Sequence, residues 1–292
     1  MNRLISFRIL CVAILLIAIC FQGISQKIPD ENILKNKIRM EYNYPADKPV
    51  KYLNTSKIIQ NMDINGMEMQ VNISSLLGCS VKSAGKQDNN LRLEIVIDTL
   101  AQDVESPNGF SGGALTEAIG KVITMVISPE GKEIDLSEAD TVLFNIPGSG
   151  EANATQFLAD YFPDLPTGKV KPGNTWAASD SVKTSSPSQT IKSLINTENE
   201  FEGIENIDGI DCAKISSTLS GTQNMFTQSQ GYDIKTSGTF TGTSVVFFAI
   251  KEGYFIKQTV TTKLTGNIEM TFPESMTFPV VIDINSVNEI VK

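Results

Sequence analysis

The sequence predicts a mainly β protein with a few short helices, made of two similar antiparallel β halves that each form a curved sheet or half-open barrel. Apolar and polar residues alternate with a period of two along most of the chain, as they do in half-buried strands. An Asn-Gly or Asp-Gly pair, which is a strong hairpin signal, stands in each half. Between the halves, residues 165–176 hold two prolines, two glycines and the only tryptophan. We therefore expect a first half at 26–164, a junction at 165–176 and a second half at 177–292.

The N-terminus has the layout of a secretory signal peptide. Arg3 and Arg8 give it a positive start, residues 9–21 are apolar, and small residues follow at 23–25. The apolar run is shorter than the roughly 20 residues that a membrane-spanning helix needs. We expect residues 1–25 to be a signal peptide and the mature chain to be periplasmic or extracellular, without a transmembrane segment. Association with the outer membrane is left open.

In the first half, alternation and turn residues predict a series of strands with two short helices. The expected strands are 37–44, 50–63, 67–73, 91–98, 121–128 and 136–144. Asn65-Gly66 is expected to turn the second strand into the third. Residues 106–113 are predicted to be a loop and residues 114–119 a short helix. Residues 153–162 have one apolar side, which predicts an amphipathic helix that ends before the prolines of the junction.

The second half repeats this order of strands and turns. The expected strands are 190–201, 211–219, 234–250, 254–270 and 280–287. Asp208-Gly209 is expected to form the first hairpin turn. Threonine alternating with Val, Ile and Phe suits a pleated surface with one solvated side. Residues 220–232 are rich in Gly, Gln and Ser and are predicted to be a polar loop.

The composition excludes several classes of function. The formal net charge is −9, and without the signal peptide it becomes about −11, from 22 Lys and Arg against 33 Asp and Glu. Such an acidic chain repels phosphate backbones, so we expect no nucleic-acid partner. The sequence has no histidine, which excludes Ser-His-Asp and Cys-His catalysis and a histidine-ligated metal. We expect no cofactor and no metal ion.

Two cysteines, Cys79 and Cys212, remain after the signal peptide, one in each half. In an oxidising compartment they could form one disulfide that ties the halves together. Cys79 is in phase with Leu77 and Val81 on one face of its strand, whereas Cys212 is out of phase with Ile215. Two separately buried thiols are therefore the alternative, and the pattern leaves both open.

Two short matches to catalytic motifs are better explained as loops and turns. Residues 109–113 match G-x-S-x-G, but no strand precedes them and no histidine is present. Residues 83–86 match S-x-x-K, but their glycine and the polar residues after it predict a hairpin turn. A carboxylate-based hydrolase stays a remote alternative because the chain has paired carboxylates, such as Glu200 with Glu202.

Two features together resemble a known group of proteins. One is a signal peptide that ends in Ser-Gln, and the other is a junction motif made of Leu165-Pro166, Val170, Gly173 and Trp176. They resemble a family of uncharacterised secreted β-rich proteins of the Bacteroidota, a domain of unknown function, although Asn174 stands where that motif leads us to expect Asp. The architecture is also similar to the half-barrels of periplasmic lipid and lipoprotein carriers. This resemblance implies an apolar cavity with residues 153–162 as a lid.

The sequence favours a non-enzymatic binding protein that holds a lipid or other apolar ligand on a curved sheet. Strands with apolar residues on both faces, such as 245–250, motivate this hypothesis. The alternative is a structural or adaptor protein of the cell envelope, which would bind a protein partner through the loops 106–113 and 220–232. The candidate ligand-binding residues are Phe157, Tyr161, Trp176, Phe247 and Phe248. For Trp176, a plug in the core is the alternative role.

Overall fold

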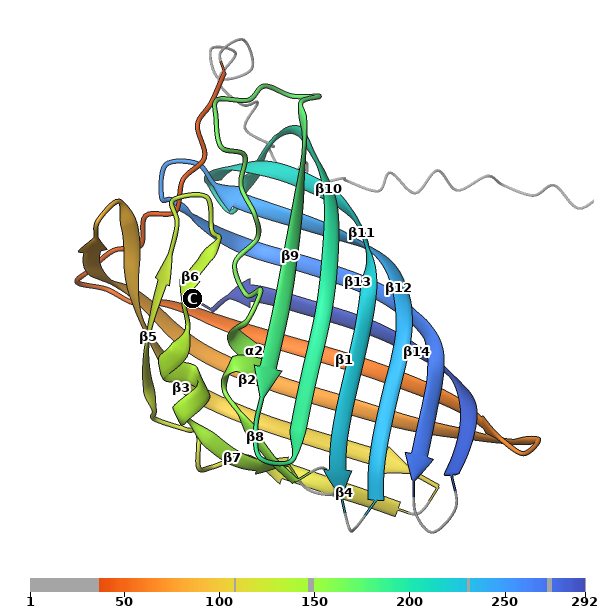
Figure 1. Ribbon diagram of the computed structural model, residues 1–292. Helices are drawn as coiled ribbons and strands as arrows, with labels where there is room; N and C mark the ends of the chain where they lie inside the picture. Colours follow the sequence, from red (N-terminus) through yellow and green to blue (C-terminus); the bar gives the residue numbers. More distant parts are fainter. Residues whose placement is uncertain (1–36, 108, 147–149, 230–231, 272–274, 292) are drawn as a thin grey trace, which may run out of the picture.

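The computed structural model is a strongly curved antiparallel sheet that wraps around one segment of its own chain (Figure 1). It describes residues 37–107, 109–146, 150–229, 232–271 and 275–291. The expected signal peptide, residues 1–25, lies outside the described residues. Within the described ranges, no helix is long and apolar enough to cross a membrane.

The described residues place twelve strands in the main sheet. Their order is β6-β5-β3-β2-β1-β14-β13-β12-β11-β10-β9, and β4 also pairs with β3. The strands of this sheet are β1 (Val50–Ile64), β2 (Met67–Gln87), β3 (Asn90–Ser106), β4 (Gly109–Ala114), β5 (Val122–Ile127), β6 (Glu133–Asp135), β9 (Thr175–Ser185), β10 (Gln189–Ile207), β11 (Ile210–Ser229), β12 (Tyr232–Ala249), β13 (Tyr254–Thr271) and β14 (Ser275–Ile290). The remaining elements are β7 (Leu143–Ile146), which pairs with β8 (Gly150–Asn153), the 3₁₀ helix η1 (Ser137–Thr141) and the helix α2 (Thr155–Leu158).

Strands from both sides of the expected junction belong to one continuous sheet. From β1 the strands step outward to the edge strand β6, the chain crosses to the other edge at β9, and β9 to β14 step back toward the centre. β14 then pairs with β1, from Tyr52 opposite Ile290 to Met62 opposite Val280. In the described part of the chain the two edge strands do not pair with each other, so the sheet stays open. The expected mainly β, antiparallel and curved architecture is confirmed.

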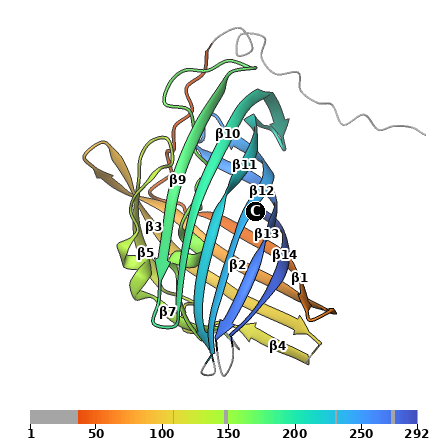
Figure 2. The same cartoon turned by 45° about the vertical axis from the view of Figure 1, so that its right-hand side comes forward.

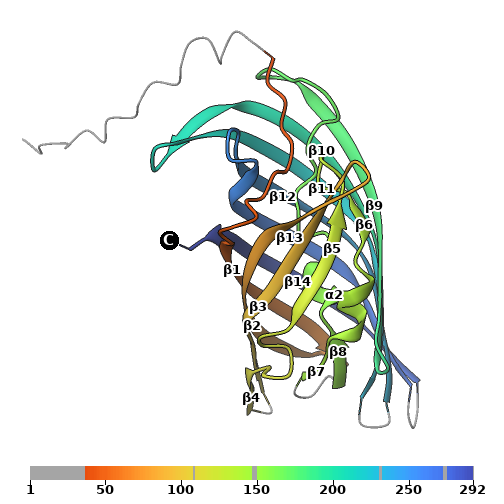
Figure 3. The same ribbon diagram turned by 90° about the vertical axis from the view of Figure 1, so that its left-hand side faces the viewer.

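The curved sheet forms a trough with two walls. Figure 2 shows the long strands β9–β14 as one wall, with β1–β3 running at an angle behind them. Figure 3 shows residues 136–146 and 150–174, which we call the crossover segment and which contain η1, β7, β8 and α2, lying between the walls. Hydrogen bonds fix this segment to both walls, since Tyr161 Oη lies 3.1 Å from Cys79 Sγ on β2 and donates to Asn288 Oδ1 on β14 at 3.3 Å.

A cluster of buried aromatic side chains joins the crossover segment to the sheet. Tyr52 on β1 donates a hydrogen bond to the backbone oxygen of Phe255 at 2.8 Å, and its hydroxyl lies 2.8 Å from that of Tyr44. The rings of Tyr161 and Phe162, which follow α2 in the crossover segment, pack edge-on against Tyr52 and Tyr44 respectively. These contacts join different parts of the chain, so the cluster ties the crossover segment to the sheet within one hydrophobic core, which we call the main core.

Glycines on the concave face let the sheet bend sharply. Gly221, Gly238, Gly242 and Gly266 lie on β11, β12 and β13, with the backbone of a neighbouring strand directly over each Cα. A Cβ on Gly238 would lie 2.7 Å from the backbone oxygen of Thr265, which is closer than real Cβ atoms approach. Strongly coiled sheets use glycine at such points because it leaves room for the adjacent backbone.

We expect Gly266→Ala to lower the free energy of unfolding by about 1–3 kcal/mol, the usual cost of overpacking. Its new Cβ would contact the backbone oxygen of Ser237 and lie 2.6 Å from Gly238 Cα. Urea unfolding followed by circular dichroism measures the change. Gly168→Ala is the control because nothing lies within 4 Å of its added Cβ, and it should change stability by less than about 0.5 kcal/mol. Equal losses in both variants would contradict the steric explanation.

The local turn signals are confirmed, but the expected first strand is wrong. Asn65 and Asp208 have φ of 55° and 52°, as two-residue hairpin turns require. Residues 37–44 alternate between buried and exposed positions as expected, yet they form a single bridge, between Ile38 and Val170, instead of a ladder. The reason is that their backbone partners lie on different segments: Tyr42 N–H donates to Pro129 O and the next residue donates to Gly253 O.

The expected helices in the first half are shorter than the sequence predicts or absent. The helix expected at 153–162 is only Thr155–Leu158, because Ala159 is extended and Asp160 takes a left-handed φ of 58°. Residues 114–119, expected to be helical, belong to the end of β4 and a turn. The strand expected at 136–144 is mostly the helix η1, followed by the start of β7.

Both segments expected to be loops are largely strands. β4 occupies most of 106–113, and residues 220–229 and 232 belong to β11 and β12. β4 is glycine-rich, but β3 supplies its backbone hydrogen-bond partners, and Gly112 packs against the backbone of Gln102 and Asp103, where a side chain would clash. The composition of these segments predicts loops, but hydrogen bonding to a neighbouring strand makes them strands.

Candidate functional site

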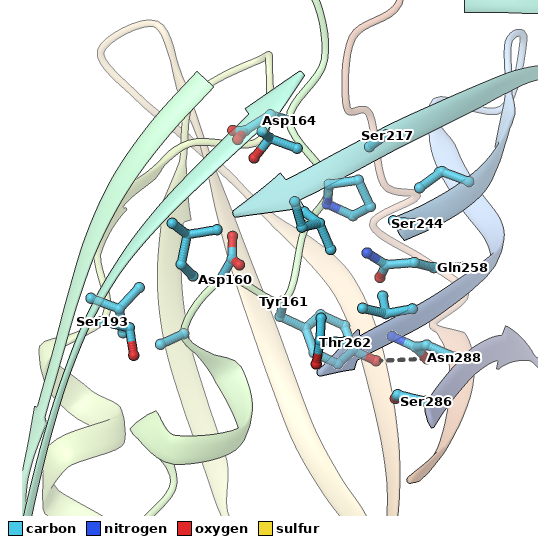
Figure 4. Close-up of a pocket in the computed structure, with 18 of the residues that line it drawn as sticks. Asp160, Tyr161, Asp164, Ser193, Ser217, Ser244, Gln258, Thr262, Ser286 and Asn288 are labelled. Carbon is cyan, nitrogen blue, oxygen red and sulfur yellow. Dashed lines mark hydrogen bonds between the residues drawn. The ribbon is translucent and has the colours of Figure 1, made fainter. Parts of the chain in front are cut away.

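A cavity of about 410 Å³ lies between the crossover segment and the wall formed by β9–β14. Figure 4 shows its lining, with Asp160, Tyr161 and Asp164 on the crossover segment and Ser217, Ser244, Gln258 and Asn288 on the sheet. This volume falls within the ~300–1,000 Å³ of typical small-molecule sites. The sheet supplies a rigid wall, and the crossover segment covers it.

The lining combines aliphatic side chains with uncharged polar groups. The apolar part consists of Phe157, Pro163, Val182, Ile191, Ile195, Ile215, Leu219, Phe240, Val246 and Val260. Hydroxyl and amide side chains alternate with them along the strands. Among the described residues that line the cavity there is no lysine or arginine, and the ionisable carboxyls are those of Asp160 and Asp164.

Three adjacent strands place a row of polar side chains in this wall. Asn199 on β10 is opposite Ser217 on β11, which is opposite Ser244 on β12. Ser217 Oγ donates a hydrogen bond to Asn199 Oδ1 at 2.6 Å. In the described part of the chain, Asn199 Nδ2 and Ser244 Oγ have no hydrogen-bond partner, although these residues are only 5% and 6% exposed. A buried polar atom without a partner costs about 1–3 kcal/mol, so a hydrogen-bond partner for either atom would be stabilising.

A second polar group in the cavity, the Tyr161 hydroxyl, holds the crossover segment against the sheet. Tyr161, only 5% exposed, makes the contacts to Cys79 and Asn288 described above. Burial raises the pKa of the Cys79 thiol to about 12. The neutral thiol is therefore unsuited to nucleophilic chemistry, and it packs as a small apolar side chain.

Several carboxyl groups lie close together where the crossover segment leaves α2. The surrounding walls raise the pKa of Asp160 to about 8, and the charges of Asp164, Asp180 and Glu133 add to this, although water reaches the Asp160 side chain. Burial, followed by its interaction with Asp180, raises the pKa of Asp164 to about 7. Burial likewise raises the pKa of Glu133 to about 7, against the hydrogen bond that its carboxylate accepts from the Asp160 backbone. Lys132 opposes the shift at Asp164.

The five residues expected to bind a ligand lie in different places. Phe157 and Tyr161 both line the cavity. Trp176 lies beside it, where its Nε1 donates to the backbone oxygen of Asp164 at 3.4 Å, and it packs partly against the main core. Phe248 is fully buried in that core, edge-on to a tyrosine ring, while Phe247 packs against a small separate cluster. Their role in binding a ligand stays a prediction.

The polar row and the two aspartates were missed by the sequence reasoning. Asn199, Ser217 and Ser244 each occupy an inward position of an alternating strand, which was the available signal. These inward positions can be recognised as one polar row only when the register of the three strands is known. Asp160 and Asp164 were assigned to a helix and to its end, so their approach to the sheet was not foreseen.

The cysteines and the carboxyls offer neither a disulfide nor a metal site in the described residues. Cys79 and Cys212 are free, buried thiols, the first in the main core and the second in a small cluster with Ala249 and Ile256. Within the described ranges, no group of three or more Cys, Asp or Glu side chains could hold a metal ion.

Comparisons with solved structures find β proteins at very low identity. An exported protein with a YmcC-like fold from Bacteroides fragilis is 10% identical with a TM-score of 0.27, over 82% of this chain and 97% of that one. Pseudomonas aeruginosa OccK2 (OpdF), in complex with glucuronate, is 7% identical with a TM-score of 0.26, over 86% and 100%. A DUF1329 family protein from Desulfovibrio piger is 14% identical with a TM-score of 0.15, over 80% and 83%. No family model and no curated protein matches the chain. TM-scores this low assign no function.

We expect the protein to be more stable to heat at pH 5.5 than at pH 8.5. Unfolded Asp and Glu carboxyls have pKa values of about 4, whereas Asp160, Asp164 and Glu133 have raised values of about 8, 7 and 7. The folded chain therefore binds more protons than the unfolded chain across this range, and the free energy of unfolding falls as pH rises. Thermal unfolding followed by circular dichroism at both pH values measures the difference.

Two variants test whether Asp160 causes the difference in thermal stability between pH 5.5 and pH 8.5. Asp160→Asn should shrink the difference in Tm between the two pH values, because asparagine does not titrate and tolerates the left-handed backbone. Glu198→Gln removes an exposed carboxyl next to Asn199 and should leave the difference unchanged. A Tm that rises with pH in the unmodified protein would contradict the assignment.

Proposed function

We propose that this chain is an exported, non-enzymatic binding protein that holds a small apolar or lipid-like ligand in the cavity of its curved sheet. One observation carries the proposal: the cavity of about 410 Å³ is lined by aliphatic side chains mixed with uncharged polar ones, and two buried polar atoms in its wall lack a partner. An apolar pocket with a few polar groups that fix orientation is typical of small-molecule sites.

The arrangement supports binding in preference to catalysis. The sequence has no histidine, and no lysine lines the described cavity, so no nitrogen base lies beside the hydroxyls of Ser217 and Ser244. The strands that carry the lining are hydrogen-bonded on both sides, apart from the edge strand β9. A wall of this kind holds its side chains in place before a ligand arrives, which reduces the entropic cost of binding.

Uptake of the neutral apolar dye N-phenyl-1-naphthylamine tests the proposal. The unmodified protein should increase the dye's fluorescence in a saturable manner. Thr262→Phe, which fills the cavity from β13, should reduce the affinity at least about tenfold, because an aromatic ring displaces the dye. Thr259→Phe places the same ring at an exposed position of the same strand and should bind the dye as the unmodified protein does.

Native mass spectrometry of protein purified from its own envelope gives an independent readout. A co-purifying small mass that is lost on denaturation, and lost from Thr262→Phe, supports the proposal. Absence of dye uptake in the unmodified protein, together with a bare mass, would reject it.

A further inference from the structure

The apolar part of the cavity can accommodate a short hydrocarbon body. Ile191 and Ile195 face it from β10, Val260 faces it from β13, and Phe157 faces it from the crossover segment. Burial of apolar surface stabilises such a body by roughly 25 cal/mol per Å², without setting its orientation. The orientation must come from the polar groups at the two sides of the cavity.

The sheet side requires a hydrogen-bond acceptor on the ligand. Asn199 Oδ1 already accepts from Ser217, so the amide's position is fixed and its Nδ2 group is the unpartnered donor. Ser244 Oγ on β12, two strands from Asn199, is the second unpartnered atom and can donate as well as accept. A hydroxyl or carbonyl oxygen on the ligand would satisfy either residue.

The opposite side favours positive charge. Asp160 and Asp164 line the cavity, and Asp180 and Glu133 stand behind them. Desolvation and the repulsion among these carboxyls disfavour the charged carboxylates, and Lys132 is the cation that acts on Asp164. A cationic group beside Asp160 and Asp164 would compensate their negative charges.

We propose that the ligand is an amphiphile that carries an amine together with a hydroxyl or carbonyl oxygen. The amine lies against Asp160 and Asp164, the oxygen accepts from Asn199 or Ser244, and the hydrocarbon body covers the aliphatic side chains. This inference rests on the proposed function of the same cavity. It excludes anionic amphiphiles such as fatty acids, because the described lining has no lysine or arginine to pair with a carboxylate.

Binding of an amine should strengthen as pH rises from 6 to 9. Over this range Asp160 and Asp164 lose their protons, with pKa values of about 8 and 7, while an alkylamine, like a lysine side chain, stays protonated to about pH 10. The charged groups that face this pair from neighbouring elements are Glu130, Lys132, Glu133, Asp135, Asp140, Asp180 and Lys183. Of these, Glu133 also titrates with a pKa of about 7, and its ionisation adds negative charge in the same direction.

Three probes with the same ten-carbon chain separate charge from apolarity: decylamine, 1-decanol and decanoate. Dissociation constants at pH 8, below the micellar range, come from calorimetry and from the fluorescence of Trp176, whose indole contacts the Asp164 backbone. We expect decylamine to bind at least about tenfold more tightly than 1-decanol, and decanoate more weakly than both. N-decylethanolamine, which adds a hydroxyl, should gain a further two- to tenfold or so over decylamine.

Matched variants assign each part of the ligand to its residues. Asp160→Asn combined with Asp164→Asn should abolish the preference for decylamine while 1-decanol still binds, which shows that the double variant is folded. Asn199→Ala should remove the extra affinity of N-decylethanolamine and keep the preference for the amine. Glu198→Gln, which removes a carboxyl from the exposed face of the same sheet, should change neither.

The outcomes separate this inference from the proposed function. Equal binding of 1-decanol and decylamine, or tighter binding of decanoate, would overturn the amine inference and leave a binding cavity in place. Decylamine affinity that is unchanged by pH, or unchanged in the double variant, would also overturn it. If none of the ten-carbon probes binds and the naphthylamine dye is also excluded, the proposed function itself fails.

Discussion

The chain leaves the sheet at one edge, β6, and has to re-enter it at the other edge, β9, and the rest of the structure depends on this constraint. The route between the edges runs through the concave face, so about forty residues are packed inside the trough instead of over its outer surface. Their side chains complete the main core, which the aromatic cluster around Tyr52 closes. Where the crossover segment does not fill the trough, its residues 156–164 and the wall of β9–β14 line the cavity.

The chemistry of the cavity follows from which parts of the chain meet there. The wall is built from strands whose hydroxyl, amide and aliphatic side chains alternate along the cavity. The crossover segment contributes carboxyls, because Asp160 occupies a left-handed turn that ends α2. Asp160 and Asp164 lie on one side of the cavity, and the row of Asn199, Ser217 and Ser244 lies in the sheet. The cavity therefore has two chemically different sides. A ligand can be oriented in such a space without any reactive side chain.

Those features that depend on neighbouring residues in the chain could be predicted from the sequence. Alternation gave the long strands, and Asn65-Gly66 and Asp208-Gly209 gave their turns, because a two-residue turn is decided by its own backbone preferences. The pairing of β1 with β14 joins residues more than two hundred positions apart, and no local pattern encodes it. For the same reason the polar row through Asn199 could not be assembled from single strands. β4 shows the converse, since its partner strand overrides a sequence that is typical of a loop.

The pairing of β1 with β14 also has a kinetic consequence. The first strand of the sheet obtains its second neighbour only from β14, the last strand that the structure describes, so the sheet cannot be completed until residues 275–290 are available. Contacts of such long sequence separation slow folding, because the entropy of closing the loop is lost before the contact is gained. Until then β1 presents an unpaired edge that can recruit other chains. Completion of the sheet is therefore delayed until residues 275–290 have been synthesised, and β1 stays at an edge until then.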